Sequence, residues 1–405
     1  MSALLDGIKI IDFTQVISGP YATYMLAQQG ADVIKLELPG DGDQARGMML
    51  PSGDFADAGH SAMFLAFNSG KRSLALNLKS PAAKEILTRL IKDADVIIEN
   101  FKAGAMERLG FGYEWAREIN QNIIYCSISG FGQSGPRAGA AAYDPVIQAN
   151  SGMMQLTGHE GITGPTKVGF WVCDMSTGMT AAFAISAALS KLHRDGEGSY
   201  IDISMLDVAA SLISPMVTNF LNFGVQPSLM GNGSPAGSTV STVYETGEGL
   251  LQVAAATQGQ FEAQAKAMNR QDLIEDPRFS SRQDRILHAA ELRQELLVTF
   301  SEADAKTWEA RLSEVGVPAG VVHSIEEMVK DPQILERGLV REQQAPTGLN
   351  GYVQTIGAPF KVNGENGLSA AAPNLGEHTE EILMGLGYSS EDLSLIHISE
   401  PTRPY

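Results

Sequence analysis

The first 135 residues alternate short apolar runs with helical segments, and this alternation constrains the fold more than any other feature. The runs are rich in Ile and Val, which is typical of parallel strands that are buried on both faces. Between two of them, Ser80 and Pro81 occupy the N-cap and the first position of a predicted amphipathic helix. This alternation predicts a doubly wound α/β sheet. The predicted strands cover residues 7–13, 31–37, 72–78, 94–101 and 122–131.

Later segments predict a second domain. Residues 199–204 predict a further strand, which a helix from Met205 follows. From about residue 243 the pattern changes to short amphipathic helices, which indicates a smaller domain that ends near residue 323. We therefore expect a large domain over 1–225, a small domain over 226–330 and a return segment over 331–392 that packs on the large domain. The final stretch, LSLIHISEPTRPY (393–405), continues no earlier pattern and is expected to be a non-native tail without function.

Composition excludes several classes of function. The net charge of −18 argues against nucleic acid as a partner, because nucleic-acid binding needs a basic surface. The two cysteines form no disulfide framework and the N-terminus lacks a signal-peptide pattern, so we expect a reducing cytoplasm. No apolar run is long and uninterrupted enough to predict a membrane span. The seven histidines show no metal-binding spacing, and we predict no metal.

The segment Val168–Gly178 (VGFWVCDMSTG) places one carboxylate, Asp174, between an apolar run and a helical pattern that starts at Thr177. We expect Asp174 to lie where a buried segment meets a helix N-terminus, because backbone N–H groups and the helix dipole favour a negative charge there. A carboxylate in such an apolar setting is short of water and can act as a nucleophile. The alternative is an aspartate that only caps the helix.

Three loops near the predicted strands carry polar side chains that suit a phosphate-bearing ligand. Ligands of doubly wound sheets bind beyond the carboxyl ends of the strands, so these loops are candidates for a binding site. The alternative is that the cations among them are ordinary solvated side chains. The residues are Gln15, Val16, Ile17 and Ser18 after the first strand, Lys71 and Arg72 before the third, and Asn100, Phe101, Lys102 and Arg108 after the fourth.

Three further motifs each allow a functional and a structural interpretation. Gly130–Gly135 (GFGQSG) matches a dinucleotide-binding pattern, but Pro136 follows and no helix opens there, so we interpret it as a flexible surface loop and predict no nicotinamide cofactor. Tyr143 and Asp144 are either a structural tyrosine and a helix cap or groups that orient the nucleophile. The loop Gly231–Gly237 either lets the backbone approach a ligand or is a linker.

Taken together, these motifs resemble the family III CoA-transferases of the formyl-CoA/carnitine type, the CaiB/BaiF family. The resemblance runs from LDGIKIIDFTQVISGP to LGEHTEEIL, which is nearly the whole chain apart from the tail. It implies a large Rossmann-like domain built from both chain ends, a small α/β domain between them, and an interlocked homodimer. The motifs that carry the resemblance are DFTQVISGP, GADVIKLE, NSGKRSLALNLK, DVIIENF, YDPVIQANSG, PTKVGFWVCD and GAPF.

The resemblance also implies roles for individual residues. It places the catalytic aspartate at Asp174 and a glycine-rich ligand loop at Gly231–Gly237. Leu38 and Ala141 depart from the pattern, because relatives can carry cations at these positions. The implied contacts to coenzyme A are Gln15, Val16, Ile17, Ser18, Lys71, Arg72, Asn100, Phe101, Arg108, Tyr143 and Asp144.

The implied reaction moves CoA from an acyl-CoA donor to a carboxylic acid acceptor. Asp174 would form an acyl-aspartyl anhydride and then an aspartyl-CoA thioester, with backbone N–H groups near Gln15–Ser18 and the glycine loop stabilising each oxyanion. Phe170 and Trp171 are expected to keep water out. The alternatives are a 2-methylacyl-CoA racemase of the same fold, a nicotinamide-dependent oxidoreductase and a non-catalytic dimeric scaffold. Such racemases carry a histidine where this chain has Tyr143, which favours transfer here.

Overall fold

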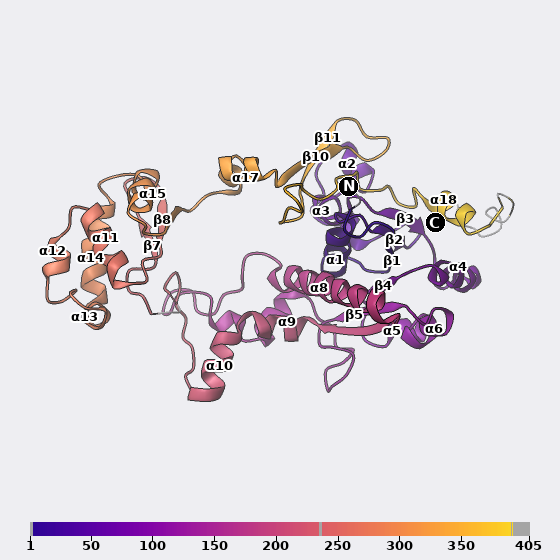
Figure 1. Cartoon of the computed structure of the whole chain (residues 1–405), viewed down its shortest axis with the longest axis horizontal. Coiled ribbons are helices and arrows are strands. Elements are labelled where there is room, and N and C mark those ends of the chain that lie inside the picture. The colour runs from indigo at the N-terminus through magenta and orange to yellow at the C-terminus, as the bar shows by residue number, and fades with distance from the viewer. Residues whose placement is uncertain (1–2, 235–236, 390, 392–405) are drawn as a thin grey trace. The chain divides into compact units, whose positions relative to one another are not determined.

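The structure, a computed structural model, describes residues 3–234, 237–389 and 391 and divides into two compact units (Figure 1). Unit 1 comprises the described residues of Met1–Met153, Val168–Gly224 and Gln333–Tyr405, and unit 2 those of Met154–Lys167 and Val225–Pro332. Residues 154–167 therefore leave the predicted large domain and belong to unit 2. The predicted tail over 393–405 lies outside the described residues.

Unit 1 is built on a parallel sheet of six strands in the order β3-β2-β1-β4-β5-β6, which confirms the predicted parallel α/β sheet. Every predicted strand contains an observed one, and the sixth matches its predicted bounds. The strand order reverses between β1 and β4, and ligands of such sheets bind at this reversal, beyond the carboxyl ends. The strands are β1 Lys9–Asp12, β2 Asp32–Glu37, β3 Arg72–Ala75, β4 Val96–Glu99, β5 Ile124–Ser129 and β6 Ser199–Ser204.

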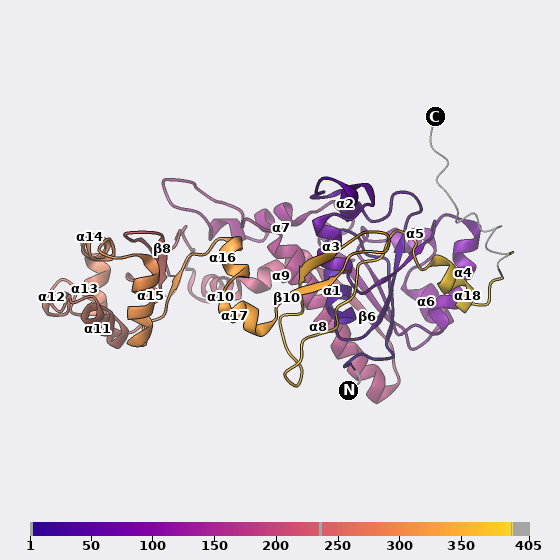
Figure 2. The same cartoon turned by 90° about the horizontal axis from the view of Figure 1, so that it is seen from above.

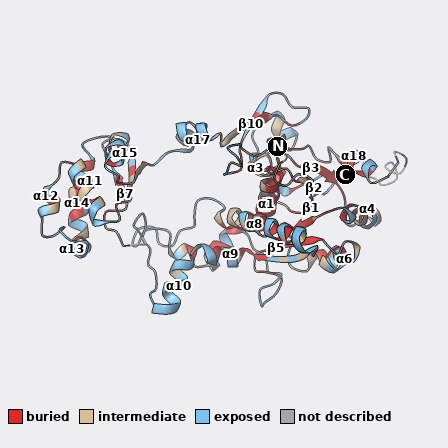
Figure 3. Ribbon diagram, viewed as in Figure 1, coloured by how far each residue is buried: buried red, intermediate tan, exposed pale blue. Residues whose placement is uncertain are grey.

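Helices cover both faces of this sheet, because successive strand residues face opposite sides. Ile10 packs in a buried cluster with residues of α1 (Ser18–Ala27) and α8 (Val172–Asp195), which lie side by side in Figures 1 and 2. Ile11 faces the other way and packs in a cluster with α4 (Pro81–Lys92). The buried residues of unit 1 therefore concentrate in the strands and on the inner helix sides (Figure 3).

The helix predicted after Ser80 is confirmed. The Ser80 hydroxyl accepts a hydrogen bond from the backbone N–H of Ala82 (3.2 Å), and Pro81 occupies the first turn. The remaining helical segments that begin in unit 1 are η1 Gln44–Gly47, α2 Asp54–Asp57, α3 Ala62–Asn68, α5 Ala105–Leu109, α6 Tyr113–Ile119, α7 Asp144–Asn150, η2 Met153–Gln155, α9 Met205–Leu212, α10 Ser214–Phe223 and α18 Thr379–Gly385. Near the chain end, β10 (Val340–Gln344) and β11 (Tyr352–Ile356) form an antiparallel pair, and Ile382 of α18 joins the cluster around Ile11.

Unit 2 has its own hydrophobic core around Trp308, Tyr244 and Phe300. Its antiparallel sheet has the order β7-β8-β9, with β7 Val243–Glu245, β8 Leu250–Val253 and β9 Ala319–Val321. Its helices are α11 Gln258–Ala267, α12 Asp272–Glu275, α13 Arg282–Leu287, α14 Ala289–Phe300, α15 Ala305–Glu314 and α16 Ile325–Val329, and α17 (Pro332–Arg337) begins at its last residue.

By length and composition, α8 is the one helix in the described part of the chain that is apolar enough to cross a membrane. The sequence patterns predicted no membrane span, because polar residues interrupt every apolar run, including this one. The buried side of α8, which includes Ala181 and Ile185, packs against α1 and the sheet.

Candidate active site

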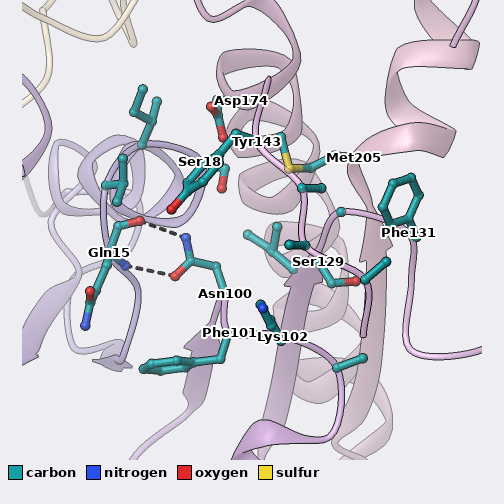
Figure 4. A pocket seen from close by; sticks show the side chains of 18 of the residues that line it. Gln15, Ser18, Asn100, Phe101, Lys102, Ser129, Phe131, Tyr143, Asp174 and Met205 are labelled. Atoms are coloured by element: carbon teal, nitrogen blue, oxygen red, sulfur yellow. Dashed lines mark hydrogen bonds between the residues drawn. The ribbon is translucent and has the colours of Figure 1, made fainter. Parts of the chain in front are cut away.

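A cavity of about 360 Å³ lies at the carboxyl ends of β1, β4 and β5, where the strand order reverses (Figure 4). The sequence predicted much of its lining, since the structure brings together Gln15 to Ser18, Asn100, Phe101, Tyr143 and Asp174. The other lining residues are Gln44, Lys102, Ala103, Ile128, Ser129, Gly130, Phe131, Gly139, Ala140, Ala141, Ala142 and Met205.

Asp174 lies in the first turn of α8, which begins at Val172 and therefore earlier than the sequence pattern indicated. Its side chain is half-buried and lines the cavity. Burial and the neighbouring Asp144 carboxylate raise the pKa of Asp174 to about 7, and a hydrogen bond from the Ser18 side chain opposes this shift. The group therefore changes between acid and carboxylate near neutral pH, a property common among catalytic carboxyl groups.

Asp144, not Asp174, caps α8. It is buried at the start of α7, and its Oδ2 atom accepts hydrogen bonds from the backbone N–H groups of Cys173 (2.7 Å) and Asp174 (3.2 Å). Its Oδ1 atom accepts a hydrogen bond from Nε2 of Gln148 (2.6 Å). Asp144 thus fixes the first turn that carries Asp174 and also places a negative charge beside it. Both interpretations of this residue fit the structure, since Asp144 caps a helix, α8, and thereby orients the backbone of Asp174.

The apolar residues before Asp174 do not enclose it within this chain. Phe170 is 59% exposed and Trp171 is 39% exposed, although the sequence pattern predicted a buried segment here. These residues precede the first helical turn and lack the packing partners that α1 and the sheet give to Ala181. Exclusion of water by Phe170 and Trp171 is therefore not a property of the single chain.

The loop after β1 is held in a strained conformation beside the cavity. Val16 has a φ of 70°, in the left-handed region that β-branched residues rarely adopt. The Asn100 side chain fixes the residue before it, since Oδ1 accepts from the N–H of Gln15 and Nδ2 donates to its carbonyl, both at 2.8 Å. The Asp43 side chain accepts from the N–H of Val16 (2.9 Å). The N–H groups of Gln15 and Val16, expected to stabilise an oxyanion, are therefore already hydrogen-bonded.

Lys71 does not line the cavity. Its side chain is buried, and Nζ donates to Oδ2 of Asp12 (3.1 Å), the carbonyl of Pro20 (3.0 Å) and Oδ1 of Asn68 (2.9 Å). Burial opposes ionisation of Asp12, but Lys71, Lys35 and two threonine hydroxyls lower its pKa to about 2. Lys71 was predicted to contact coenzyme A, but its three donors are instead used inside the protein, beneath the loop after β1.

Lys35 completes this buried group of ions. Its Nζ atom pairs with Oδ2 of Asp43 and donates to the carbonyl of Thr14, both at 2.8 Å. Asp43 in turn holds the N–H of Val16. Removing one partner of a buried ion pair strongly destabilises a protein. Because Asp43 bonds both to Lys35 and to the N–H of Val16, this buried group holds the strained loop in a fixed position.

Arg72 and Arg108 also lie outside the cavity lining. Arg72 begins β3, and its guanidinium pairs with Asp32 at the start of β2 (2.6 Å), so it belongs to the amino-end half of the strands. The prediction grouped it with the carboxyl-end loops although it is the first residue of its strand. Arg108 is exposed in the last turn of α5. The predicted contact of Arg108 with coenzyme A stays a prediction.

Sequence reasoning overlooked several residues of the lining. Gly130 and Phe131 line the cavity, so GFGQSG is not merely a flexible surface loop, and its position directly after β5 was the available signal. Ser129 ends the same strand, and Gln44 follows β2 in a short helical turn. In a doubly wound sheet, any residue that directly follows a strand is a candidate for the ligand-binding site at the carboxyl ends, whatever its residue type.

One cationic side chain and three helix N-termini contribute to the electrostatic character of the cavity. Of the described residues that line it, Lys102 alone is cationic, and it points into the cavity in Figure 4. Ser18, Asp174 and Met205 lie in the first turns of α1, α8 and α9, so three helix N-termini face the lining. Helix N-termini favour anions, so the cavity suits a negatively charged ligand even in a chain of net charge −18.

The glycine-rich loop over 231–237 belongs to unit 2, and residues 235 and 236 lie outside the described residues. Gly231 has a φ of 53°, and its N–H donates to the carbonyl of Gly158 (2.8 Å). Its predicted contact with a ligand stays a prediction. In the described part of the chain, no group of three or more His, Cys, Asp or Glu side chains is arranged to hold a metal ion.

Comparisons with known proteins cover nearly the whole chain. A family model described as CoA-transferase family III matches residues 5–379. The chain is 37% identical to the succinate–glutarate CoA-transferase of Agrobacterium fabrum over 94% of this chain and 95% of that protein. It is 36% identical to the succinyl-CoA:mesaconate CoA-transferase of Haloarcula marismortui over 94% and 95%. A crystal structure of a CAIB/BAIF family protein from Brucella suis aligns with a TM-score of 0.84 at 33% identity, over 95% of this chain and all of that one.

Proposed function

The chain belongs to CoA-transferase family III, and from this premise we propose that Asp174 is the nucleophile that carries first the acyl group and then CoA. The observation that carries the proposal is the position of Asp174. It lines the cavity at the reversal of the sheet, in the first turn of α8, with a pKa raised by burial and by Asp144 to about 7. A carboxylate at this edge, with anion-favouring helix ends around it, suits a thioester of an acidic cofactor.

The proposed reaction has four balanced steps. An Asp174 oxygen attacks the donor thioester, a C–O bond forms, the C–S bond breaks and CoA leaves as thiolate. The thiolate attacks Cγ of Asp174, which forms the aspartyl-CoA thioester and expels the donor acid. The acceptor carboxylate attacks that thioester and releases thiolate again. The thiolate then attacks the acceptor carbonyl, which forms the product thioester and restores Asp174. A thiol with a pKa of about 8.5 is a tolerable leaving group for these steps.

The substrates are proposed to be dicarboxylic acids and their CoA thioesters. The names of the two relatives given above refer to succinate, glutarate and mesaconate, all of which are dicarboxylic acids. In this chain, Lys102 points into the cavity, and the N-termini of α1, α8 and α9 favour a second negative charge. A monocarboxylic acceptor would offer no second carboxylate to Lys102.

The proposed assembly is the interlocked homodimer with a Rossmann-like large domain, acting in the cytoplasm. The exposed side chains of Phe170 and Trp171 support a second chain over this segment, since an anhydride must be protected from water. The strand order with its reversal between β1 and β4 supports the Rossmann-like assignment.

The test compares wild type with Asp174→Ala and with Asp195→Ala, which removes a carboxylate from the other end of the same helix. Transfer from succinyl-CoA to a panel of mono- and dicarboxylic acids is measured by mass spectrometry. We expect Asp174→Ala to lose transfer while Asp195→Ala keeps it, and incubation of wild type with acyl-CoA and hydroxylamine should modify Asp174. Near-normal turnover by Asp174→Ala, or a label on another residue, contradicts the proposal.

The same assay separates the alternative activities. Exchange of an α-proton into deuterated water without CoA transfer would indicate racemisation. Transfer to monocarboxylic acids as fast as to dicarboxylic acids would reject the proposed substrate class but leave the role of Asp174 intact.

A further inference from the structure

Ser18 lies directly against the carboxyl group of Asp174. It is buried as the first residue of α1, it lines the same cavity as Asp174, and its side chain lowers the pKa of that carboxyl group. Figure 4 shows the two side chains adjacent at one end of the cavity, which both residues line.

The packing of α1 on α8 fixes this contact. Gly178 follows Asp174 by one turn on the same helix face. A Cβ atom added to Gly178 would lie 2.6 Å from the carbonyl oxygen of Ser18 and 2.9 Å from Cδ1 of Tyr21. Only a residue without a side chain permits α8 to approach the start of α1 so closely. The glycine therefore brings the carboxyl group of Asp174 within reach of the Ser18 hydroxyl.

Several donors of the loop after β1 and of the start of α8 are already engaged. The N–H of Gln15 is bonded to Asn100 and the N–H of Val16 to Asp43. The amide of Asn100 donates to the carbonyl of Gln15. The amide N–H of Asp174 itself donates to Asp144. These groups hold the loop and the helix start, and they are not directed at the carboxyl oxygens of Asp174.

We propose that Ser18 is a catalytic residue whose hydroxyl stabilises the oxyanion that forms on Asp174 itself. This inference rests on the proposed function. When the CoA thiolate attacks Cγ of Asp174, the S–C bond forms and the electron pair of the carbonyl moves onto the Asp174 oxygen. When the pair returns, the anhydride C–O bond breaks and the donor acid leaves. The Ser18 hydroxyl donates to this carboxyl group throughout and keeps its own proton.

The same reasoning separates two kinds of step. In the first acylation, charge develops on the carbonyl oxygen of the substrate and not on Asp174. In aspartyl-CoA formation and in its attack by the acceptor, charge develops on the oxygen of Asp174. Loss of the Ser18 hydroxyl should therefore slow the steps at Cγ of Asp174 much more than the first acylation.

The test uses rapid-quench kinetics of the full chain at pH 9, where Asp174 is ionised, with succinyl-CoA as the donor. Release of thiol into a thiol-reactive dye reports the first acylation, and the mass of the aspartyl-CoA adduct reports the second step. For Ser18→Ala we expect thiol release within about threefold of wild type, and adduct formation slower by about 100-fold. Because the trapped anhydride then hydrolyses, the ratio of donor hydrolysis to transfer should rise. Ser18→Thr, which keeps a hydroxyl, should recover most of the adduct rate.

Ser186→Ala is the control, since this exposed serine lies on α8, the helix that carries Asp174, and its hydroxyl donates to the carbonyl of Ala182. It should leave both rates unchanged. An adduct rate in Ser18→Ala within twofold of wild type, or an equal loss in both steps, overturns the role of Ser18. The proposed function fails separately, if wild type forms no adduct on Asp174 or if Asp174→Ala keeps its turnover. Normal thiol release by Ser18→Ala also shows that the variant is folded.

Discussion

Replacing Asp144 with asparagine should shift the pH dependence of the enzyme to lower pH. Asp144 is the neighbouring charge that raises the pKa of Asp174, second to burial, to about 7 from an ordinary value of 3.8. Burial is the larger cause of this rise and stays in the variant, so we expect the loss of the Asp144 charge to lower the pKa of Asp174 by roughly one unit. Asn keeps an oxygen that can accept from the N–H groups of Cys173 and Asp174 but removes the charge.

The expected result follows from the ionised fraction of Asp174. The attacking form is the carboxylate, so kcat/KM rises with pH through the pKa of the free enzyme. With a pKa of about 7, roughly a tenth of the sites are active at pH 6, and with a pKa of about 6, roughly half are. The variant should therefore keep about five times more of its plateau activity at pH 6 than wild type does.

The assay is kcat/KM for succinyl-CoA between pH 5 and 9, with each profile normalised to its plateau. The plateau itself should fall, because an uncharged cap holds the first turn of α8 less firmly. Asp195→Asn removes a carboxylate from the far end of the same helix and should leave the profile in place. The reasoning is refuted if the acidic limb of Asp144→Asn stays where it is in wild type, or if Asp195→Asn moves it as far.

Two further predictions concern stability. Gly178→Ala should lower the free energy of unfolding by about 2 kcal/mol, because the new methyl group would lie 2.6 Å from the backbone carbonyl oxygen of Ser18. Urea unfolding measures this change. The control is Gly259→Ala, whose Cβ atom would meet nothing within 4 Å, so this substitution should be neutral or stabilising. Asp174→Asn should raise the free energy of unfolding by about 2 kcal/mol at pH 8.5. Folding raises the pKa of Asp174, so the wild-type protein loses stability as the pH rises from the pKa of the unfolded state to that of the folded state, and asparagine avoids this loss. That gain should vanish below pH 4, and an equal gain at both pH values would contradict the pKa argument.

Much of unit 1 could be predicted because its signals are local. Ile- and Val-rich runs gave the strands, and the Ser80-Pro81 start with its apolar stripe gave α4 in full. Asp174, Gln15 to Ser18 and Asn100 were identified because each follows or borders a strand or helix whose end the pattern marks. The periodicity of a strand or helix, and the burial of one of its faces, depend on residues that are close in sequence, so a local pattern predicts them.

Long side chains were the main source of error. Lys71 was expected to face a phosphate, but its ammonium group reaches back to Asp12, far away in the sequence. No local pattern distinguishes a lysine that pairs with a buried aspartate from one that binds a ligand, because the cost of burying the charge depends on distant partners. The same limit applies to Phe170 and Trp171, whose apolar character indicated burial although the chain leaves them exposed.

The sequence alone determined that this chain forms a parallel α/β sheet with one carboxylate, Asp174, at a helix start, because periodicity and helix-start residues act over a few positions. Only the tertiary structure decided what surrounds that carboxylate. Asp144 caps its helix from 30 residues away in sequence, and Gly178 lets α1 bring Ser18 against it. The reactivity of Asp174 depends on charge, burial and hydrogen bonds within a few ångströms, and those neighbours come from segments that only folding brings together.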